Sequence, residues 1–505
     1  MISRIPSYSW GILAMIVWGG AILALGLVRF TPYGLDEGAA RGLLLNWSIV
    51  DAVANPIVIF GLPDFRALFF VPLGLYWTGS MVAAKVYTLI MTFSAILLFY
   101  NWNRQTVSNE SALIASALLA IAPITLTQAD AIGVGPYLLL IFGLAAWLDK
   151  TYRASSRSSG GWLFMQLLLV GICVTLHPMG LAYPLALLWR WYKEPSQDAV
   201  SINHRKHVLI GVPIAALVLL VMREGWDLMH WWSNPFTGLS RIIAINPSEE
   251  PGLAGGIIFA VLLLGVMVAE RRALLGSLVG NMLLFGVLIG LTAADAAWAM
   301  VALVLILYYG IPRLIAVNQA FNKNSLLGQR GLVMVVMVIA ATVFMLNLRD
   351  YRQVIQDDVL SAEDKLIQLL SMEAADTKQP FRAASQWPGR TMIACKRDVL
   401  PLPPPAKEGE DFLKNIKGIT HLMFNPYQPT YRELGRTIAQ LGGATQTLAL
   451  QQGGVIVKIR EVAAKPPGAP PHAPGMDAQV QRAQEPPGAA FRPPATITPP
   501  EVPTK

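Results

Sequence analysis

RFTPYGLDEGAARG, Arg29 to Gly42, follows the first long apolar run of the chain and places two adjacent acids, Asp36 and Glu37, just beyond it. The apolar run, from Tyr8 to Val28, is long enough to cross a bilayer. It lacks a small-residue cleavage site at its end, so we expect an uncleaved first span and not a removed signal peptide. The role of the two acids then depends on which side of the membrane they face.

The composition is that of a polytopic membrane protein. Of 505 residues, 54% are hydrophobic and only 14% are charged, whereas soluble domains have about 25% charged residues. The net charge of +8 does not predict a nucleic-acid partner, because the basic residues lie in short loops between apolar runs, where membrane topology explains them. Two cysteines, Cys173 and Cys395, give no disulfide framework.

Apolar runs of membrane-crossing length recur through the first two-thirds of the chain. We predict eleven transmembrane helices, near residues 9–28, 83–100, 111–127, 132–148, 162–175, 179–192, 208–222, 253–269, 273–291, 296–309 and 331–347. Two of them, 162–175 and 179–192, are short and joined by a His-Pro turn, which suits a cavity or a locally thinned bilayer.

Alternate loops differ in positive charge, which orients the chain. One set holds fourteen Lys and Arg residues, whereas the other holds five: Arg29, Arg41, Arg66, Arg223 and Arg241. The positive-inside rule then places the N-terminus in the cytoplasm. Asp36, Glu37 and everything after Asn347 are therefore expected on the outer face.

Two outer loops contain segments suited to the membrane interface. In the first, we predict interfacial helices at residues 36–50 and 63–78. In the second, at residues 223–252, Trp226, Trp231 and Trp232 fit interfacial anchors. The alternative is that these tryptophans, with His230, contact a sugar ring or a lipid tail.

After about Asp350 the chain changes character. The segments RTMIAC (390–395), ITHLMF (419–424) and GGVIVKI (453–459) predict strands, and residues 361–372 and 429–443 predict helices. From Lys465 the Pro-rich sequence cannot form a core, so it predicts a disordered tail, either a spacer or a docking segment for an envelope protein.

The expected fold is thus a polytopic α-helical membrane protein with a small soluble α/β domain and a disordered tail. The predicted boundaries are 1–348 for the transmembrane domain, 349–463 for the outer-face, periplasmic α/β domain and 464–505 for the tail.

Three acids are candidates for catalysis. Asp36 and Glu37 begin an interfacial segment beside the first span, and Asp130 lies between two apolar runs on the same outer face. The alternative for these acids is a solvated loop or turn residue without a catalytic role. A second carboxylate close to the first is what paired acid–base chemistry requires.

Five basic residues are candidates for binding a phosphate: Arg41, Arg66, Lys85, His177 and Arg241. Lys85 lies near the start of a span, where a lone charge is costly, although it could extend to the headgroups instead. His177 could donate a hydrogen bond to a phosphate or cap its turn. The sequence has no zinc-type metal motif, and a divalent ion held by carboxylates stays an open alternative.

The acid pair in LDEGAARGLL (35–44), after a first span and before an interfacial segment, resembles the GT-C superfamily of polytopic glycosyltransferases. Protein mannosyltransferases and aminoarabinose transferases are most similar. Residues 112–153 are similar to the family's third and fourth spans with an acid between them. TLHPMGLAYPLALLWRW (175–191) resembles its short helix pair, and the likeness covers residues 1–350.

The resemblance implies an inverting transfer of a sugar from a polyprenyl-phosphate donor to an acceptor hydroxyl on a protein, a lipid or a glycan. Asp36 would be the general base, Glu37 would position the acceptor or support Asp36, and Asp130 would assist. The five basic residues would bind the departing lipid phosphate. The chain departs from the family in having Gly34-Leu35 before the acids and LPDF (62–65) where tandem prolines are common.

Two other functions stay open from the sequence. A transporter would have charged residues buried in the middle of its spans and hydropathy symmetry between its halves, whereas the acids here are expected at one membrane face and no repeat is detected. A non-catalytic scaffold displaying the α/β domain to an envelope partner would have the same composition. For each reading we expect a multi-pass protein of a bacterial inner membrane, in contact with membrane lipids.

Overall fold

A computed structural model describes most of the chain. The described residues are 29, 31–51, 69–154, 160–193, 209–214, 235–243, 253–291, 295–321, 326–357, 360–377, 381–406, 409–428, 431–441, 444–451 and 454–459. All of them belong to one compact unit that ends at Ile459. The first predicted span and the predicted tail lie outside the described residues.

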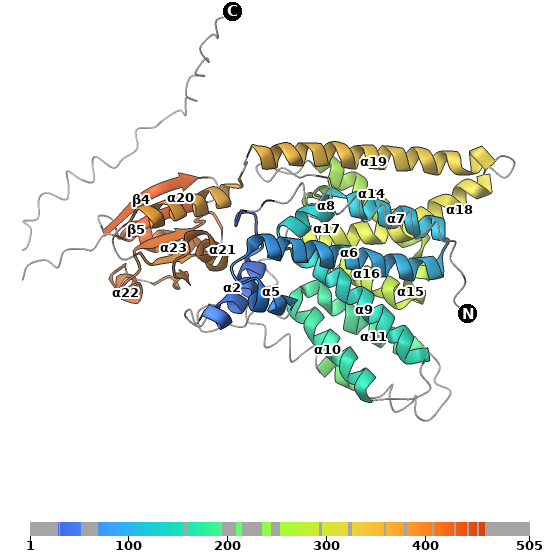
Figure 1. Cartoon of the computed structure of the whole chain (residues 1–505), viewed down its shortest axis with the longest axis horizontal. Coiled ribbons are helices and arrows are strands. Elements are labelled where there is room, and N and C mark those ends of the chain that lie inside the picture. The colour runs from blue at the N-terminus through green and yellow to red at the C-terminus, as the bar shows by residue number, and fades with distance from the viewer. Residues whose placement is uncertain are drawn as a thin grey trace, which may run out of the picture. The chain divides into compact units, whose positions relative to one another are not determined.

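The described part begins with a helical region (Figure 1). Its elements are α2 (Glu37–Asp51), α5 (Val71–Tyr76), α6 (Met81–Thr106), α7 (Asn109–Ile121), α8 (Pro123–Asp130), α9 (Val134–Ala154), α10 (Gly160–Leu176), η1 (Pro178–Leu181), α11 (Ala182–Lys193), α13 (Pro235–Ser240), α14 (Leu253–Ala269), α15 (Arg271–Gly276), α16 (Leu278–Gly290), α17 (Ala296–Leu305), η2 (Ile306–Gly310), α18 (Ile311–Phe321) and α19 (Leu326–Gln356).

Several of these helices start at a side-chain cap. Ser80, Ser108, Ser277 and Asp295 precede α6, α7, α16 and α17, and each accepts a hydrogen bond from the backbone N–H three residues on. Such caps satisfy donors that have no partner within the helix. They fix the residue at which each of these helices begins.

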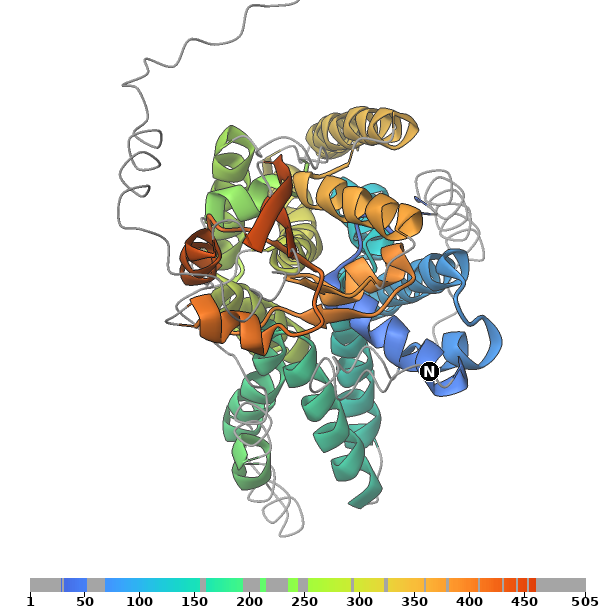
Figure 2. The ribbon, with the colours of Figure 1, turned by 90° about the vertical axis from the view of Figure 1, so that its left-hand side faces the viewer.

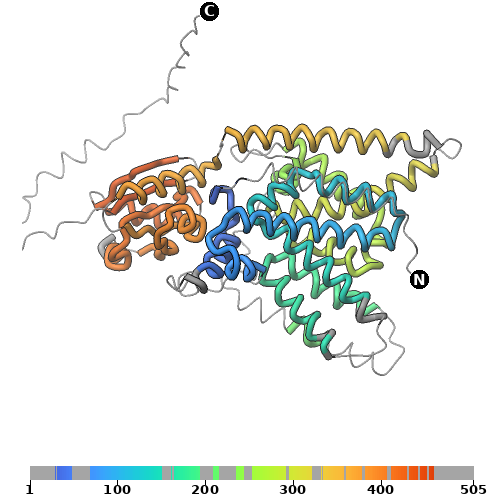
Figure 3. Tube along the Cα trace, viewed as in Figure 1, coloured from blue at the N-terminus to red at the C-terminus, as the bar shows by residue number. Residues whose placement is uncertain are grey.

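The centre of the helical region is apolar and closely packed. Helices α6 and α9 pack against each other, as do α11 and α16, and α16 and α17. Every residue of α17 from Ala297 to Leu305 is buried. Helix α19 returns along α7 and α8 as one uninterrupted element (Figure 3).

The number of membrane-crossing helices is not established as eleven. Within the described ranges, three helices are long and apolar enough to cross a bilayer: Met81–Thr106, Ala296–Ala320 and Met334–Gln356. A fourth crossing would be the pair α7 and α8, which bends by 50° at Pro123. Further apolar helices, such as α14, have 17 residues or fewer.

The second region alternates helices and strands. Its elements are α20 (Ala362–Asp376), β1 (Ala383–Ser385), α21 (Pro388–Cys395), β2 (Val399–Pro401), α22 (Gly409–Asn415), β3 (His421–Phe424), α23 (Arg432–Gln440), β4 (Thr445–Gln451) and β5 (Gly454–Ile459). The sheet order is β2-β1-β3-β5-β4. Strand β1 pairs in parallel with β2 and β3, and β5 is antiparallel to β3 and β4.

Helices cover both faces of this sheet (Figure 2). Leu422 and Phe424 of β3 point to one face, where they pack with residues of α22 and α23. Met423 points to the other face, where it packs with residues of α20 and α21. This alternation along a strand is the period of two that a doubly covered sheet requires.

Most of the expected elements of this region are confirmed, and one is wrong. The expected helices at 361–372 and 429–443 are α20 and α23, and the expected strands at 419–424 and 453–459 are β3 and β5. RTMIAC is not a strand, because it lies in α21. Parallel strands need a crossover, and α21 supplies the one between β1 and β2.

Candidate functional site

Asp36 lies directly before α2 and caps its first turn. Its Oδ1 accepts a hydrogen bond from the Ala39 backbone N–H at 3.1 Å. Its own backbone N–H donates to the Ala131 carbonyl at 2.8 Å, which joins the acidic loop to the turn after α8. The side chain is half-buried. Asp36 is therefore held at a helix N-terminus, where the peptide dipoles favour a negative charge.

Asp130, the last residue of α8, is buried and surrounded by donors. Its Oδ1 accepts from the Arg29 backbone N–H at 2.9 Å and from Lys85 Nζ at 2.7 Å. Its Oδ2 accepts from the Tyr351 hydroxyl at 2.8 Å. The Lys85 side chain has no exposed surface. Lys85 thus neither extends to the headgroups nor faces open solvent, and its charge is compensated inside the protein.

The turn after Asp130 has a strained backbone. Ile132 has a φ of +54° and is fully buried. A β-branched side chain rarely adopts this conformation, which costs of order 1–3 kcal/mol. Such strain persists where the surrounding structure fixes it, often at functional sites. Here it shapes the turn whose Ala131 carbonyl holds Asp36.

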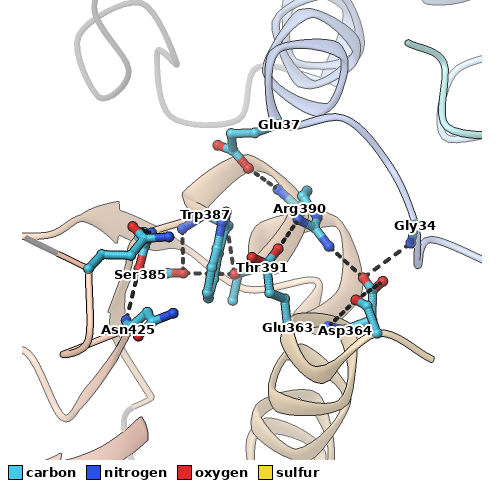
Figure 4. A network of polar contacts seen from close by, with 12 residues as sticks. Gly34, Glu37, Glu363, Asp364, Ser385, Trp387, Arg390, Thr391 and Asn425 are labelled. Carbon is cyan, nitrogen blue, oxygen red and sulfur yellow. Dashed lines mark hydrogen bonds and ion pairs between the residues drawn. The ribbon is translucent and has the colours of Figure 1, made fainter. Parts of the chain in front are cut away.

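Glu37 points to the α/β region (Figure 4). Its Oε1 accepts from the Gly389 backbone N–H at 2.8 Å, and its Oε2 accepts from the Arg390 backbone N–H at 3.1 Å. Arg41 Nε donates to Oε1 at 2.8 Å. Burial raises the pKa of Glu37 above its ordinary value, although Arg41 and the two backbone donors act in the opposite direction.

Arg390 continues this network (Figure 4). Its guanidinium donates to Asp364 Oδ1 at 2.6 Å and to Glu363 Oε2 at 3.1 Å. Asp364 Oδ1 also accepts from the Gly34 backbone N–H at 3.1 Å. Sequence reasoning missed Arg390 and Asp364 because no local motif marks them, and Arg390 was expected in a strand.

His177 lies in a separate polar group. It caps η1, since its Nδ1 accepts from the Met179 backbone N–H at 3.2 Å. Its Nε2 lies 2.9 Å from Asp295 Oδ2. The positive charge of Arg241, whose side chain is exposed, also acts on Asp295. The structure thus brings together two of the five predicted phosphate-binding residues, with an acid that the sequence reasoning did not include.

The remaining predicted residues divide into two groups. Arg41 is half-buried and paired with Glu37. Five residues lie outside the described part of the chain: Arg66, Trp226, His230, Trp231 and Trp232. In the described ranges, no three His, Cys, Asp or Glu side chains are grouped so that they could hold a metal ion.

No protein-family model matches the chain, and no curated protein is significantly similar to it in sequence. Solved structures are similar in fold. Archaeal oligosaccharyltransferase AglB from Archaeoglobus fulgidus, in complex with an inhibitory peptide and a dolichol-phosphate, has a TM-score of 0.53 at 12% identity. That match covers 81% of this chain and 69% of AglB.

ArnT from Cupriavidus metallidurans, bound to undecaprenyl phosphate, has a TM-score of 0.51 at 12% identity, over 90% of this chain and 98% of ArnT. Both are GT-C superfamily glycosyltransferases. This chain has the GT-C fold. The resemblance inferred from LDEGAARGLL is therefore confirmed at the level of fold, and with the apolar helices it indicates a membrane protein.

Proposed function

We propose that the protein is an inverting glycosyltransferase that uses a polyprenyl-phosphate sugar as donor. The fold supports this, since two similar structures hold a dolichol-phosphate and an undecaprenyl phosphate. The observation that carries the proposal is the position of Asp36, a half-buried carboxylate at a helix N-terminus, held from a strained turn. The reaction would take place on the outer, periplasmic face of a bacterial inner membrane.

Asp36 is the general base in this proposal. Its carboxylate takes the proton of an acceptor hydroxyl while the hydroxyl oxygen bonds to the anomeric carbon of the sugar. The bond from that carbon to the phosphate oxygen breaks, and its electron pair leaves with the lipid phosphate. Attack opposite the leaving group inverts the anomeric carbon. General-base assistance of this kind contributes about 10²–10⁴-fold to the rate.

The leaving phosphate needs fixed positive charge. Arg241 is the described residue we assign to it, because its positive charge acts near the start of α17. His177 receives a positioning role instead, because its Nδ1 accepts from the Met179 N–H and its Nε2 is engaged with Asp295. Arg66 remains a prediction from sequence, and so do contacts of the acceptor or sugar with Trp226, His230, Trp231 and Trp232.

Asp130 and Lys85 receive a structural role in this proposal. A buried carboxylate with three donors is poorly placed to take a substrate proton. Lys85 would have to leave Asp130 uncompensated to bind a phosphate, which is costly in a buried site. Their ion pair instead fixes the turn that holds Asp36.

The test compares the wild-type protein with Asp36→Asn. Asparagine caps a helix as well as aspartate does, so this variant removes the base and keeps the cap. We expect sugar transfer to fall at least ~10²-fold with the thermal stability retained. Mass spectrometry of lipids that co-purify with each protein should find a polyprenyl phosphate on both and its sugar-loaded form accumulating on the variant.

Glu433→Gln is the matched control, because Glu433 is an exposed acid in the first turn of another helix, α23. It should leave transfer unchanged. If neither the wild type nor Asp36→Asn retains a polyprenyl phosphate, the proposal is wrong. If both retain it in the same form and the wild type transfers no sugar, the chain is a non-catalytic relative.

A further inference from the structure

The α/β region presents a known type of binding edge to the acidic loop. Helix α21 follows β1 and packs on one face of the sheet, and α23 follows β3 and packs on the other. Strands β1 and β3 are parallel neighbours. In open parallel sheets, this change of side is where ligands bind, at the carboxyl ends of the strands and against a helix N-terminus.

In this chain, a side chain of the protein itself, Glu37, occupies the N-terminus of α21 where a ligand would bind. Trp387, before α21, makes no side-chain cap, and Pro388 at the first helical position has no N–H to donate. The next two donors, at Gly389 and Arg390, both go to the Glu37 carboxylate. These are the donors that an N-cap side chain normally satisfies. Glu37 therefore caps α21 from another helix, 352 residues away from Gly389 in sequence.

The donor edge of α21 is itself rigid. Ser385 Oγ accepts from the Trp387 backbone N–H at 2.9 Å and lies 3.0 Å from Thr391 Oγ1. Thr391 Oγ1 also donates to the Trp387 carbonyl. These hydrogen bonds fix the start of the helix from both sides (Figure 4). The carboxylate of Glu37 thus meets a preformed pair of N–H groups.

A second connection lies on the other side of Asp36. The Gly34 backbone N–H donates to Asp364, which Arg390 also contacts. Tyr33 packs against the apolar core between α20, α21 and the sheet. Asp36 is thereby flanked by contacts at residues 33, 34 and 37 that all lead to the α/β region.

We propose that the α/β region is a clamp that uses the ligand-binding edge of its sheet to hold the acidic loop and so to position Asp36. Glu37 and Arg390 are positioning residues and do not touch the reacting atoms. The proposal rests on the function proposed above for Asp36. It also explains the adjacent acids: the first caps α2 and faces the acceptor, and the second is a fixed internal ligand of α21.

Two variants break this clamp from opposite sides. Glu37→Ala removes the carboxylate. Gly389→Val fills the space between the helices, because even a Cβ at Gly389 would lie 3.0 Å from Glu37 Oε1 and from Arg41 Cγ. Matched controls are Glu433→Ala, at an exposed first-turn acid, and Gly331→Val, where an added Cβ meets nothing within 4 Å.

Hydrogen–deuterium exchange of the full-length protein in detergent is the first measurement. We expect both clamp variants to speed exchange at least tenfold in peptides covering residues 31–47 and 386–395, with the controls unchanged. Normal exchange in strands β3 and β5 would show that the α/β region stays folded. Unchanged exchange at 31–47 in both clamp variants would overturn the proposal, whatever the protein transfers.

Sugar transfer then separates positioning from catalysis at Glu37. Glu37→Gln keeps an oxygen that accepts from Gly389, so it should retain most of the wild-type rate, whereas Glu37→Ala should lose up to ~10²-fold through misplacement of Asp36. Equal loss in both variants with normal exchange would make Glu37 catalytic and refute the clamp. Absence of transfer by the wild type would refute the proposed function and leave the exchange result standing.

Discussion

Asp130 and Glu37 are two carboxylates beside the same loop, and they hold it in different ways. The donors to Asp130 come from Arg29, Lys85 and Tyr351, all in or next to the helical region. The backbone donors to Glu37 come from the α/β region. The first set connects separate parts of the helical region, whereas the second connects the helical region to the α/β region. Asp36, between them, is the acid of the three that we assign to chemistry.

The comparison shows that acids with similar surroundings in the sequence have different roles in the structure. In sequence, the three acids look alike as outer-face residues next to apolar runs. In the structure, one is neutralised by a buried lysine, one caps a helix of another region, and one caps its own helix. Their donors, and not their positions in sequence, separate structural from catalytic roles.

The largest expected effect comes from breaking the buried ion pair. Lys85→Met leaves the Asp130 charge without its cation in a site where both side chains have at most 6% of their surface exposed. We expect the free energy of unfolding in detergent to fall by about 3–5 kcal/mol, because a buried charge is left uncompensated. Chemical denaturation, monitored by tryptophan fluorescence, measures this loss.

The control for this prediction is Lys414→Met, which breaks an exposed pair with Asp411 and should cost under ~1 kcal/mol. The double variant Lys85→Met with Asp130→Asn removes both charges and should recover part of the loss. If Lys85→Met is no more destabilising than Lys414→Met, the ion pair does not fix the turn after α8.

The sequence was sufficient for features that depend on local pattern. The apolar run 253–269 coincides with α14, and the interfacial segment predicted at 36–50 is α2 to within a residue at each end. The N-terminal position of Asp36 before a helix also follows from local signals, because aspartate is a favoured cap.

The sequence was insufficient where partners are distant. Asp130 and Tyr351 are 221 residues apart, and Glu37 and Arg390 are 353 apart. Nothing in either neighbourhood identifies the other, since hydrogen bonds of this kind are selected only when the whole fold forms. RTMIAC was misassigned for the same reason, because its role as a crossover helix depends on where β1 and β2 pair.

A smaller effect is expected from the α/β side of the clamp. Arg390→Met removes the cation from Asp364, which keeps hydrogen bonds from the Gly34 N–H and the Ser361 hydroxyl. We expect a loss of about 3 kcal/mol in the free energy of unfolding, the lower end of the range for a broken buried ion pair, because the Arg390 side chain has 9% of its surface exposed and that of Lys85 has none. Hydrogen exchange of residues 31–47 should rise in the same variant.

Glu363→Gln is the control for Arg390, because it changes only the outer contact of the same guanidinium, to a side chain with 37% exposure. It should cost under ~1 kcal/mol and leave exchange at residues 31–47 unchanged. Equal effects of the two variants would mean that the contact between Arg390 and Asp364 does not stabilise the acidic loop at residues 31–47.

The smallest effect tests the charge state of the Glu37 contact. Burial raises the pKa of Glu37, so the folded state binds a proton more tightly than the unfolded state does. The tighter proton binding stabilises the folded state fully below pH 4.5, the ordinary pKa of glutamate. This contribution to the free energy of unfolding is lost as the pH rises through the raised pKa of Glu37. Glu37→Gln does not titrate, so its free energy of unfolding should rise relative to that of the wild type between pH 4 and pH 7. Denaturation of both proteins at the two pH values measures the difference. The opposite result would be a wild type whose stability rises with pH relative to that of Glu37→Gln. It would mean that Arg41 and the two α21 backbone donors lower the pKa of Glu37 more than burial raises it, and that the clamp is strongest with Glu37 charged.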